Sequence, residues 1–134
     1  MTLQKFHFYF KPVLQVLSNQ EIIHRKDIMA KVATLLNVSK IDLELESEKG
    51  TSIFDSRIHW AQAYLAKALA ITRPTRGYFQ ITERGLFLLE KYPEGFDTSA
   101  LDQFPDYISA WGGKYIEPHQ AKSGIKIKGY YKKP

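Results

Sequence analysis

The 134-residue chain contains no cysteine, so it can form neither a disulfide framework nor a thiolate metal site. It also has no run approaching the roughly 18 apolar residues that a membrane-spanning helix needs. At the N-terminus, Lys5, His7 and Lys11 interrupt an aromatic cluster and no small-residue cleavage site follows, which argues against a signal peptide. These absences lead us to expect a cytoplasmic protein with no membrane partner.

The sequence also lacks the patterns of the common catalytic sites. No aspartate or glutamate stands two positions before a lysine, the spacing that metal-dependent nucleases of the commonest restriction-enzyme type require. There is no glycine-rich phosphate loop, no G-x-S-x-G elbow and no H-E-x-x-H pair. The four histidines are scattered and are not grouped with carboxylates at ligand spacing. We therefore expect no catalytic residue, no metal site and no cofactor in this chain.

The apolar content of 44%, with 13% aromatic residues, is enough for the core of a single domain. The net charge of +5 is unevenly distributed, because residues 114–134 contain six lysines and one acid and so account for all of it. Within the remaining chain, residues 49–76 are locally basic, as phosphate binding would require, although an ordinary solvated surface fits the same pattern. They contain one acid, Asp55, against five basic side chains: Lys49, Arg57, Lys67, Arg73 and Arg76.

Apolar spacing and capping residues predict several helices. The first two cover residues 11–17 and 25–36, and a capping box from Ser39 to Asp42 opens a short third helix. A long amphipathic helix is then predicted from Phe54 to Ile71, opened by a second capping box, Ser52 with Asp55.

The two sides of the long helix differ in character. One side has the four-three spacing of a buried stripe: Phe54, Ile58, Ala61, Leu65, Ala68 and Leu69. The opposite side has small and polar residues, with two further residues at its margin: Ser56, His59, Ala63, Lys67 and Ala70, with Gln62 and Ala66. A surface of this kind suits a DNA groove, and it also suits ordinary exposure to solvent.

Two strand-like segments, residues 71–74 and 78–81, follow the long helix. Thr75-Arg76-Gly77 between them predicts a tight hairpin, because glycine readily adopts the positive φ that such turns need. Thr82 is expected to cap another helix, with three residues facing inward: Leu86, Leu89 and Tyr92.

The last part of the chain predicts an extra C-terminal helix, capped by Ser99 and Asp102, and then a basic tail at residues 114–134. The tail is either a flexible arm or an interdomain linker. A long helix that continues directly into an arginine-bearing hairpin is the order of a winged helix-turn-helix domain, which puts the helix in the major groove and the wing on the backbone. We therefore predict an α+β, mostly helical fold, with the winged-helix domain at residues 1–113.

Eight side chains of the long helix and the wing are candidates for contact with nucleic acid: Ser56, Arg57, His59, Gln62, Lys67, Arg73, Thr75 and Arg76. Those on the exposed side of the helix suit contacts with bases or phosphates, and the arginines of the wing suit phosphates or the minor groove. The alternative for each is an ordinary solvated side chain.

Arg57 has a structural alternative, because it stands at the flank of the long helix near Trp60 and Tyr64. Stacking on these rings would tie the helix to its neighbour instead of leaving the guanidinium for a phosphate. We expect the two aromatic residues to be buried, so that Trp60→Ala would cost roughly 3–5 kcal/mol of stability.

The long helix contains Phe54-x-x-Arg57-Ile58-His59-Trp60-Ala61-x-x-Tyr64-Leu65-x-x-Ala68, and the wing region contains Pro74-x-Arg76-Gly77 and Ile81-Thr82-x-x-Gly85. Leu36-Asn37-Val38-Ser39 and Leu101-x-x-Phe104-Pro105-x-Tyr107 complete the pattern. Over about residues 6–108 it resembles the N-terminal winged-helix domain of Mrr-type restriction proteins. The family's Ala-Gly after the long helix is Ala68-Leu69 here, which bears on how the helix continues into the wing.

The resemblance implies a bacterial DNA-binding module that precedes a nuclease domain acting on foreign or methylated DNA. Double-stranded DNA is then the expected partner, together with a nuclease domain or subunit, and a homodimer stays open. No motif position fixes the reading of methylated bases, so that property is assigned to no residue. The alternative function is a protein-interaction or dimerisation module without direct DNA contact, which suits the neutral sum of charges in residues 1–113.

Overall fold

The computed structural model describes residues 3–110, which form seven α-helices, one 3-10 helix and three short strands. The elements, in chain order, are η1 (Phe6–Tyr9), α1 (Phe10–Val16), β1 (Ile23–His24), α2 (Arg25–Leu35), α3 (Lys40–Glu44), α4 (Ile53–Lys67), β2 (Ile71–Thr72), β3 (Tyr78–Ile81), α5 (Glu83–Lys91), α6 (Thr98–Leu101) and α7 (Pro105–Ala110). The predicted basic tail at residues 114–134 lies outside the described residues. Within them, no helix is both long enough and apolar enough to span a membrane.

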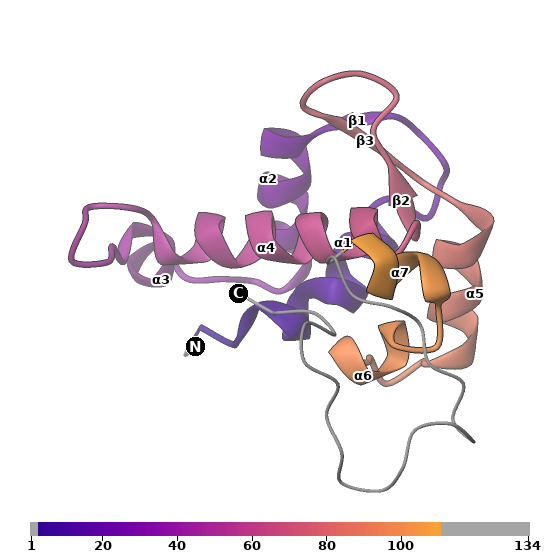
Figure 1. Ribbon diagram of the computed structural model, residues 1–134. Coiled ribbons are helices and arrows are strands. Elements are labelled where there is room, and N and C mark those ends of the chain that lie inside the picture. Colours follow the sequence, from indigo (N-terminus) through magenta and orange to yellow (C-terminus); the bar gives the residue numbers. More distant parts are fainter. Residues whose placement is uncertain (1–2, 111–134) are drawn as a thin grey trace, which may run out of the picture.

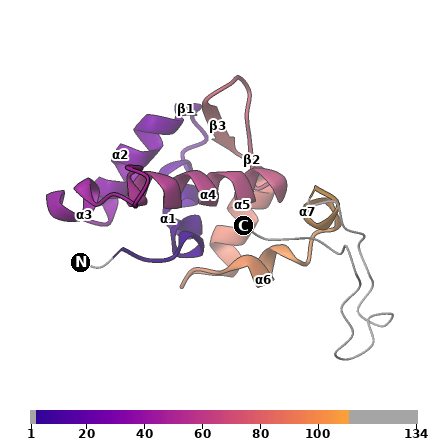
Figure 2. The same cartoon turned by 60° about the vertical axis from the view of Figure 1, so that its left-hand side comes forward.

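The long helix α4 runs through the middle of the molecule, with α2 and the wing on one side and α6 on the other (Figure 1). The same arrangement is seen after rotation (Figure 2). Its predicted apolar stripe is buried from Phe54 to Ala68 and contacts η1, α1 and α7. Tyr64 is also fully buried, and this burial raises the pKa of its hydroxyl to about 12. Leu69, predicted to close the stripe, is instead 48% exposed.

The three strands form one antiparallel sheet in the order β1-β3-β2. The wing consists of β2, β3 and the turn between them, and Gly77 in that turn has a φ of +83°, as the hairpin prediction requires. Strand β1 is too short to be recognised from its own sequence, and it pairs with β3 so that Ile23 lies opposite Phe79. The result is the α+β, mostly helical, winged-helix-like arrangement that the sequence predicts.

Three of the predicted helix caps are confirmed. The hydroxyls of Ser39, Ser52 and Thr82 accept hydrogen bonds from backbone N–H groups three residues later, at 3.1, 3.2 and 3.2 Å. These caps satisfy backbone donors that have no partner within the helix itself, and so they fix where α3, α4 and α5 begin.

Two predicted helices differ from the observed ones by more than one residue at an end. Helix α4 ends at Lys67, and Ile71, predicted as its last residue, opens β2 instead. The predicted C-terminal helix is two short helices, α6 and α7. The prediction that Ser99 caps the first of them was wrong, because Asp97 is the cap and accepts a hydrogen bond from the Ser99 N–H. Pro105 starts α7, where the missing N–H of a proline costs nothing because the first N–H groups of a helix have no partner within it.

The inward face of α5 is centred on Leu88, which is fully buried. The three residues predicted to face inward are partly buried around it: Leu86, Leu89 and Tyr92. The prediction therefore identified the side of α5 that packs inward, but it missed the most buried residue of that side, Leu88.

Helix α5 lies close to the start of the sheet at Gly85. A Cβ atom added there would lie 2.3 Å from the Ala70 carbonyl oxygen and 2.6 Å from Cγ1 of Ile81. The Ala70 carbonyl also accepts a hydrogen bond from the Thr82 N–H at 3.0 Å, so it cannot move away freely. The absence of a side chain at Gly85 therefore allows α5 to pack against the base of the wing.

We expect Gly85→Ala to lower the free energy of unfolding by about 3 kcal/mol, because it overpacks a fixed backbone contact. Gly50→Ala is the control: it has open space around its Cβ but a φ of +78°, so it should cost only about 1 kcal/mol of backbone strain. Urea denaturation of both variants measures the difference. Equal losses would contradict the close approach of α5 to Ala70.

Candidate nucleic-acid interface

A groove with a volume of about 650 Å³ lies between α4 and the wing. We call it the helix–wing groove and define it by six of its lining residues: Arg25, His59, Gln62, Lys67, Arg73 and Arg76. Four of these side chains carry a positive charge, and within residues 3–110 no aspartate or glutamate lines the groove. A concave surface of one sign attracts anions and strengthens the local field.

A second groove of about 610 Å³ lies between α2 and the N-terminal half of α4. Its lining includes Lys26, Ser56 and one acid, Asp55, together with apolar residues of α2. Arg25 and His59 line both grooves, so the two meet at these side chains. The exposed side of α4 is therefore bordered by hollows along most of its length.

The structure brings together most of the sequence-predicted contact residues. Ser56 lines the groove beside α2, and four others join His59 in the helix–wing groove: Gln62, Lys67, Arg73 and Arg76. Thr75 is exposed in the turn of the wing and lines neither groove. On the side of α4 that the helical wheel predicts to be exposed, His59 is exposed to solvent, and three residues are half-buried: Ser56, Ala63 and Lys67.

Two residues of that predicted side are buried instead. Gln62 is only 2% exposed, so the expectation that it projects freely from α4 was wrong. Ala70 is fully buried because it lies beyond the end of α4, where the chain has already turned towards the sheet. Gln62 was predicted to lie at the margin of the exposed side. The exposure of a side chain at such a margin depends on which neighbouring elements pack over it, and the helical periodicity does not give this.

Arg57 and Trp60 lie on the flank of α4. The Arg57 guanidinium donates a hydrogen bond from Nη1 to the Gln4 carbonyl at 2.9 Å, which ties α4 to the segment before η1 and separates Arg57 from both grooves. Trp60 is 37% exposed and meets the His59 ring edge-to-face, with ring centroids 5.7 Å apart, so the prediction that it is a core residue was wrong. On a helical wheel it lies about 120° from Phe54, outside the buried stripe.

Arg25 is the groove residue that sequence reasoning missed. It is the first residue of α2, and its N–H donates to the Gly77 carbonyl in the wing at 2.8 Å. The preceding residue, His24, caps α2 by accepting from the Lys26 N–H at 3.2 Å and meets the Tyr78 ring edge-to-face. Only the pairing of β1 with β3 brings Arg25 to the wing, and a strand of two residues leaves no sequence signal from which this pairing could be predicted.

The exit from α4 determines how the wing is oriented relative to the helix. The Leu69 N–H donates to the Ala66 carbonyl at 3.0 Å, and the Ala70 N–H donates to the Leu65 carbonyl at 2.9 Å. This hydrogen-bond pair is a Schellman motif, which needs a left-handed residue at the position of Leu69. Leu69 has a φ of +61°, so a leucine occupies a conformation that favours glycine.

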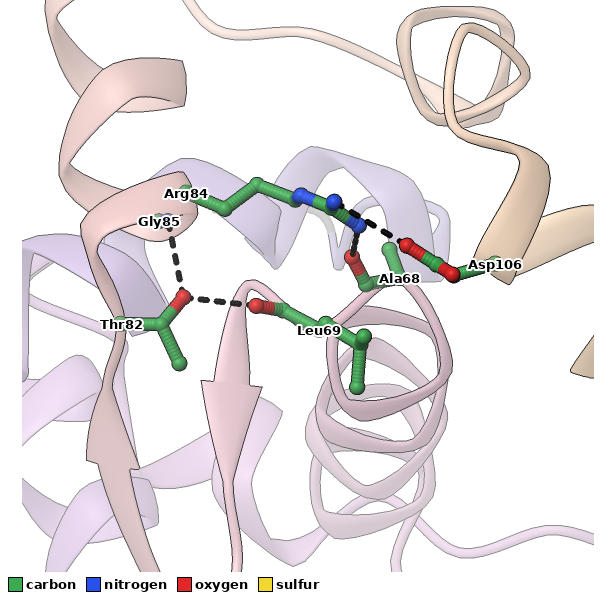
Figure 3. Close-up of polar contacts among 6 residues, drawn as sticks. All are labelled: Ala68, Leu69, Thr82, Arg84, Gly85 and Asp106. Carbon is green, nitrogen blue, oxygen red and sulfur yellow. Dashed lines mark hydrogen bonds and ion pairs between the residues drawn. The ribbon is translucent and has the colours of Figure 1, made fainter.

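Two side chains from the start of α5 hold the end of α4 in place (Figure 3). The Thr82 hydroxyl donates to the Leu69 carbonyl at 2.6 Å, and Nη1 of Arg84 donates to the Ala68 carbonyl at 2.9 Å. The same guanidinium forms an ion pair with Asp106 of α7 at 3.1 Å and lies 4.3 Å from the centre of the Phe104 ring. A cation at a helix C-terminus also interacts favourably with the helix dipole.

The strain at Leu69 gives a prediction for stability. Leu69→Gly should be more stable than Leu69→Ala by about 1 kcal/mol, because alanine keeps the left-handed strain and glycine removes it. Relative to the wild type, the glycine variant should be as stable or slightly more stable, since nearly half of the leucine side chain is exposed. Urea denaturation of the two variants makes the comparison, and an alanine variant as stable as the glycine variant would contradict it.

The comparison with known proteins concerns the family of the chain. A family model described as the Mrr N-terminal domain matches residues 6–91, from η1 through the wing to the end of α5. No curated protein and no solved structure matches the chain. Within residues 3–110 there is no group of three or more histidine, aspartate or glutamate side chains that could hold a metal ion. The match covers more than half of the chain and confirms the predicted resemblance: the chain belongs to the Mrr N-terminal domain family.

Proposed function

We propose that this domain binds double-stranded DNA as the specificity module of a restriction system. The exposed side of α4 enters the major groove, and the wing lies against the adjacent sugar-phosphate backbone. The observation that carries the proposal is the helix–wing groove, in which four cationic side chains, and no acid of the described residues, surround a hollow beside the exposed side of α4.

The shape of α4 suits the major groove, which is wide enough to admit an α-helix. Its outward side presents the short side chains of Ser56 and Ala63 next to His59, so the helix backbone can approach the base edges closely. Helix α2 and the wing stand on the same side of α4, where they can reach the phosphates on either side of the groove (Figure 1).

The distribution of charge supports the same orientation. The acidic residues Glu44, Glu46 and Glu48 are exposed at α3 and the loop that follows it, at the opposite end of α4 from the wing (Figure 1). The cationic groove lies at the C-terminal half of α4. A domain with no net charge in residues 1–113 can thus attract a phosphate backbone with one surface and repel it with another.

Membership of the Mrr N-terminal domain family supports a place for this module in a restriction system. In that role the domain would select DNA for a nuclease domain or subunit that supplies the catalytic groups. Titrating the full chain with unmethylated, adenine-methylated and cytosine-methylated duplexes of one sequence tests whether base methylation changes the affinity.

A protein-interaction role is the second candidate, and the apolar side chains of α3 and its C-cap favour it. Ile41 is 74% exposed, and Leu43 and Leu45 are also exposed. Neighbouring exposed apolar residues of this kind are common where a protein partner binds. If this were the function of the domain, charge changes in the helix–wing groove would leave partner binding intact and duplex binding would be absent.

The first prediction concerns phosphate contacts. Arg76→Ala and Lys67→Ala should each weaken binding to duplex DNA by a similar factor for every sequence. Each should also reduce the slope of log affinity against log salt by about 0.9, because one fewer counterion is released. Fluorescence anisotropy of a labelled duplex at several salt concentrations measures both effects.

Arg57→Ala is the matched control for these variants. It removes the same charge from α4, but at a guanidinium that is bonded to Gln4 and lines neither groove. Its salt slope should stay close to the wild-type value. An equal reduction in all three variants would mean that only net charge matters, and the proposed docking geometry would be wrong.

The second prediction concerns base contacts. His59 lies where the two grooves meet and is exposed on the outward side of α4. His59→Ala should change the ranking of duplexes in a library selection by about 1–3 kcal/mol at one or two base positions, because a base contact carries sequence information. An unchanged ranking would show that this part of α4 does not reach the base edges.

A further inference from the structure

Gln62 combines burial with an unused hydrogen-bond donor. The residue is 2% exposed, and its Nε2 has no hydrogen-bond partner among residues 3–110. Buried amide groups in folded proteins are nearly always paired, because an unpaired donor loses its bond to water and gains nothing in return. An exception of this kind, at the wall of a groove, indicates a place for an acceptor that arrives with a ligand.

The surroundings of Gln62 identify the chemistry of that acceptor. The groove it lines also contains the side chains of Arg25, Arg73 and Arg76, and no aspartate or glutamate of residues 3–110 lines it. A neutral base edge would leave these cations uncompensated, whereas a phosphate group offers both negative charge and acceptor oxygens. An amide can also turn its NH₂ group towards such an oxygen by rotation about its last torsion.

We propose that the helix–wing groove binds one backbone phosphate of the DNA and that the Gln62 side-chain amide donates a hydrogen bond to it. This inference rests on the proposed function and gives Gln62 a specific role in it. Gln62 is thus a phosphate-binding residue and not a residue that reads base edges. The cations of the groove hold the charge of the phosphate, and the amide fixes its position against α4.

The role makes opposite predictions for stability and for binding. Gln62→Met keeps the size of the side chain but removes the unpaired donor, so the free protein should unfold at a higher urea concentration than the wild type. The same variant should bind duplex DNA about tenfold more weakly, the loss expected for one hydrogen bond to a charged group. The loss should be equal for all sequences, and the salt slope should not change, because a neutral side chain releases no counterion.

Gln80→Met is the matched control. Gln80 lies on β3, and its Nε2 already donates to the Gln20 carbonyl at 2.9 Å. The same chemical change there removes a satisfied hydrogen bond, so the protein should unfold at a lower urea concentration while its affinity for the duplex stays at the wild-type value.

Nuclear magnetic resonance tests the contact directly. The side-chain NH₂ signals of Gln62, assigned by their absence in Gln62→Met, should shift when a duplex of 12 base pairs is added to the full chain. Inorganic phosphate is the second arm. A shift with phosphate in a protein that does not bind duplex would identify a site for free phosphate and overturn the DNA proposal.

Three further results would overturn the role of Gln62. The first is a Gln62→Met variant that binds duplex as tightly as the wild type, which would leave the proposed function standing without this contact. The second is a loss of affinity confined to some sequences, which would identify a base contact. The third is a variant that unfolds more easily than the wild type, which would assign Gln62 a purely structural partner. A wild-type chain that binds neither duplex nor phosphate would instead remove the proposed function itself.

Discussion

The hydrogen bonds around the end of α4 determine where the wing lies, and the candidate interface depends on them. Leu69 reverses the chain in a left-handed conformation, Thr82 binds its carbonyl, and Arg84 binds the carbonyl of Ala68 (Figure 3). Because Thr82 also caps α5, one side chain joins the end of one helix to the start of the next. The separation between α4 and the wing, and so the width of the groove between them, follows from this junction.

The same junction explains how an electrically neutral body can present a basic surface. By turning β2 back beside α4, it brings the arginines of the wing next to Lys67 and to Arg25, which precedes them by about fifty positions in the sequence. The acidic residues around α3 are kept at the far end of the helix (Figure 1). The net charge of residues 1–113 is therefore a poor guide to the charge of any one surface, which depends on how the fold distributes the charged side chains.

The fold was largely predictable because its signals are local. Capping hydroxyls such as Ser52 and Thr82 and the apolar period of α4 depend on residues a few positions apart. Strand β1 and the role of Arg25 were not predictable, because both depend on pairing with a strand more than fifty residues later. The predictions that Gln62 is exposed and that Trp60 is buried failed for a related reason. A helical wheel gives only the direction of each side chain around the helix axis, whereas the elements that cover a given direction come from distant parts of the chain.

The central claim is that one surface, made of the exposed side of α4, the start of α2 and the wing, meets the DNA. Mapping backbone amide shifts on the full chain while adding a duplex tests it most directly. The account predicts that the shifted signals cluster at Arg25, His59, Arg73 and residues 75–77, with α3 unchanged. Signals that shift mainly around Ile41, or that do not shift at all, would contradict it.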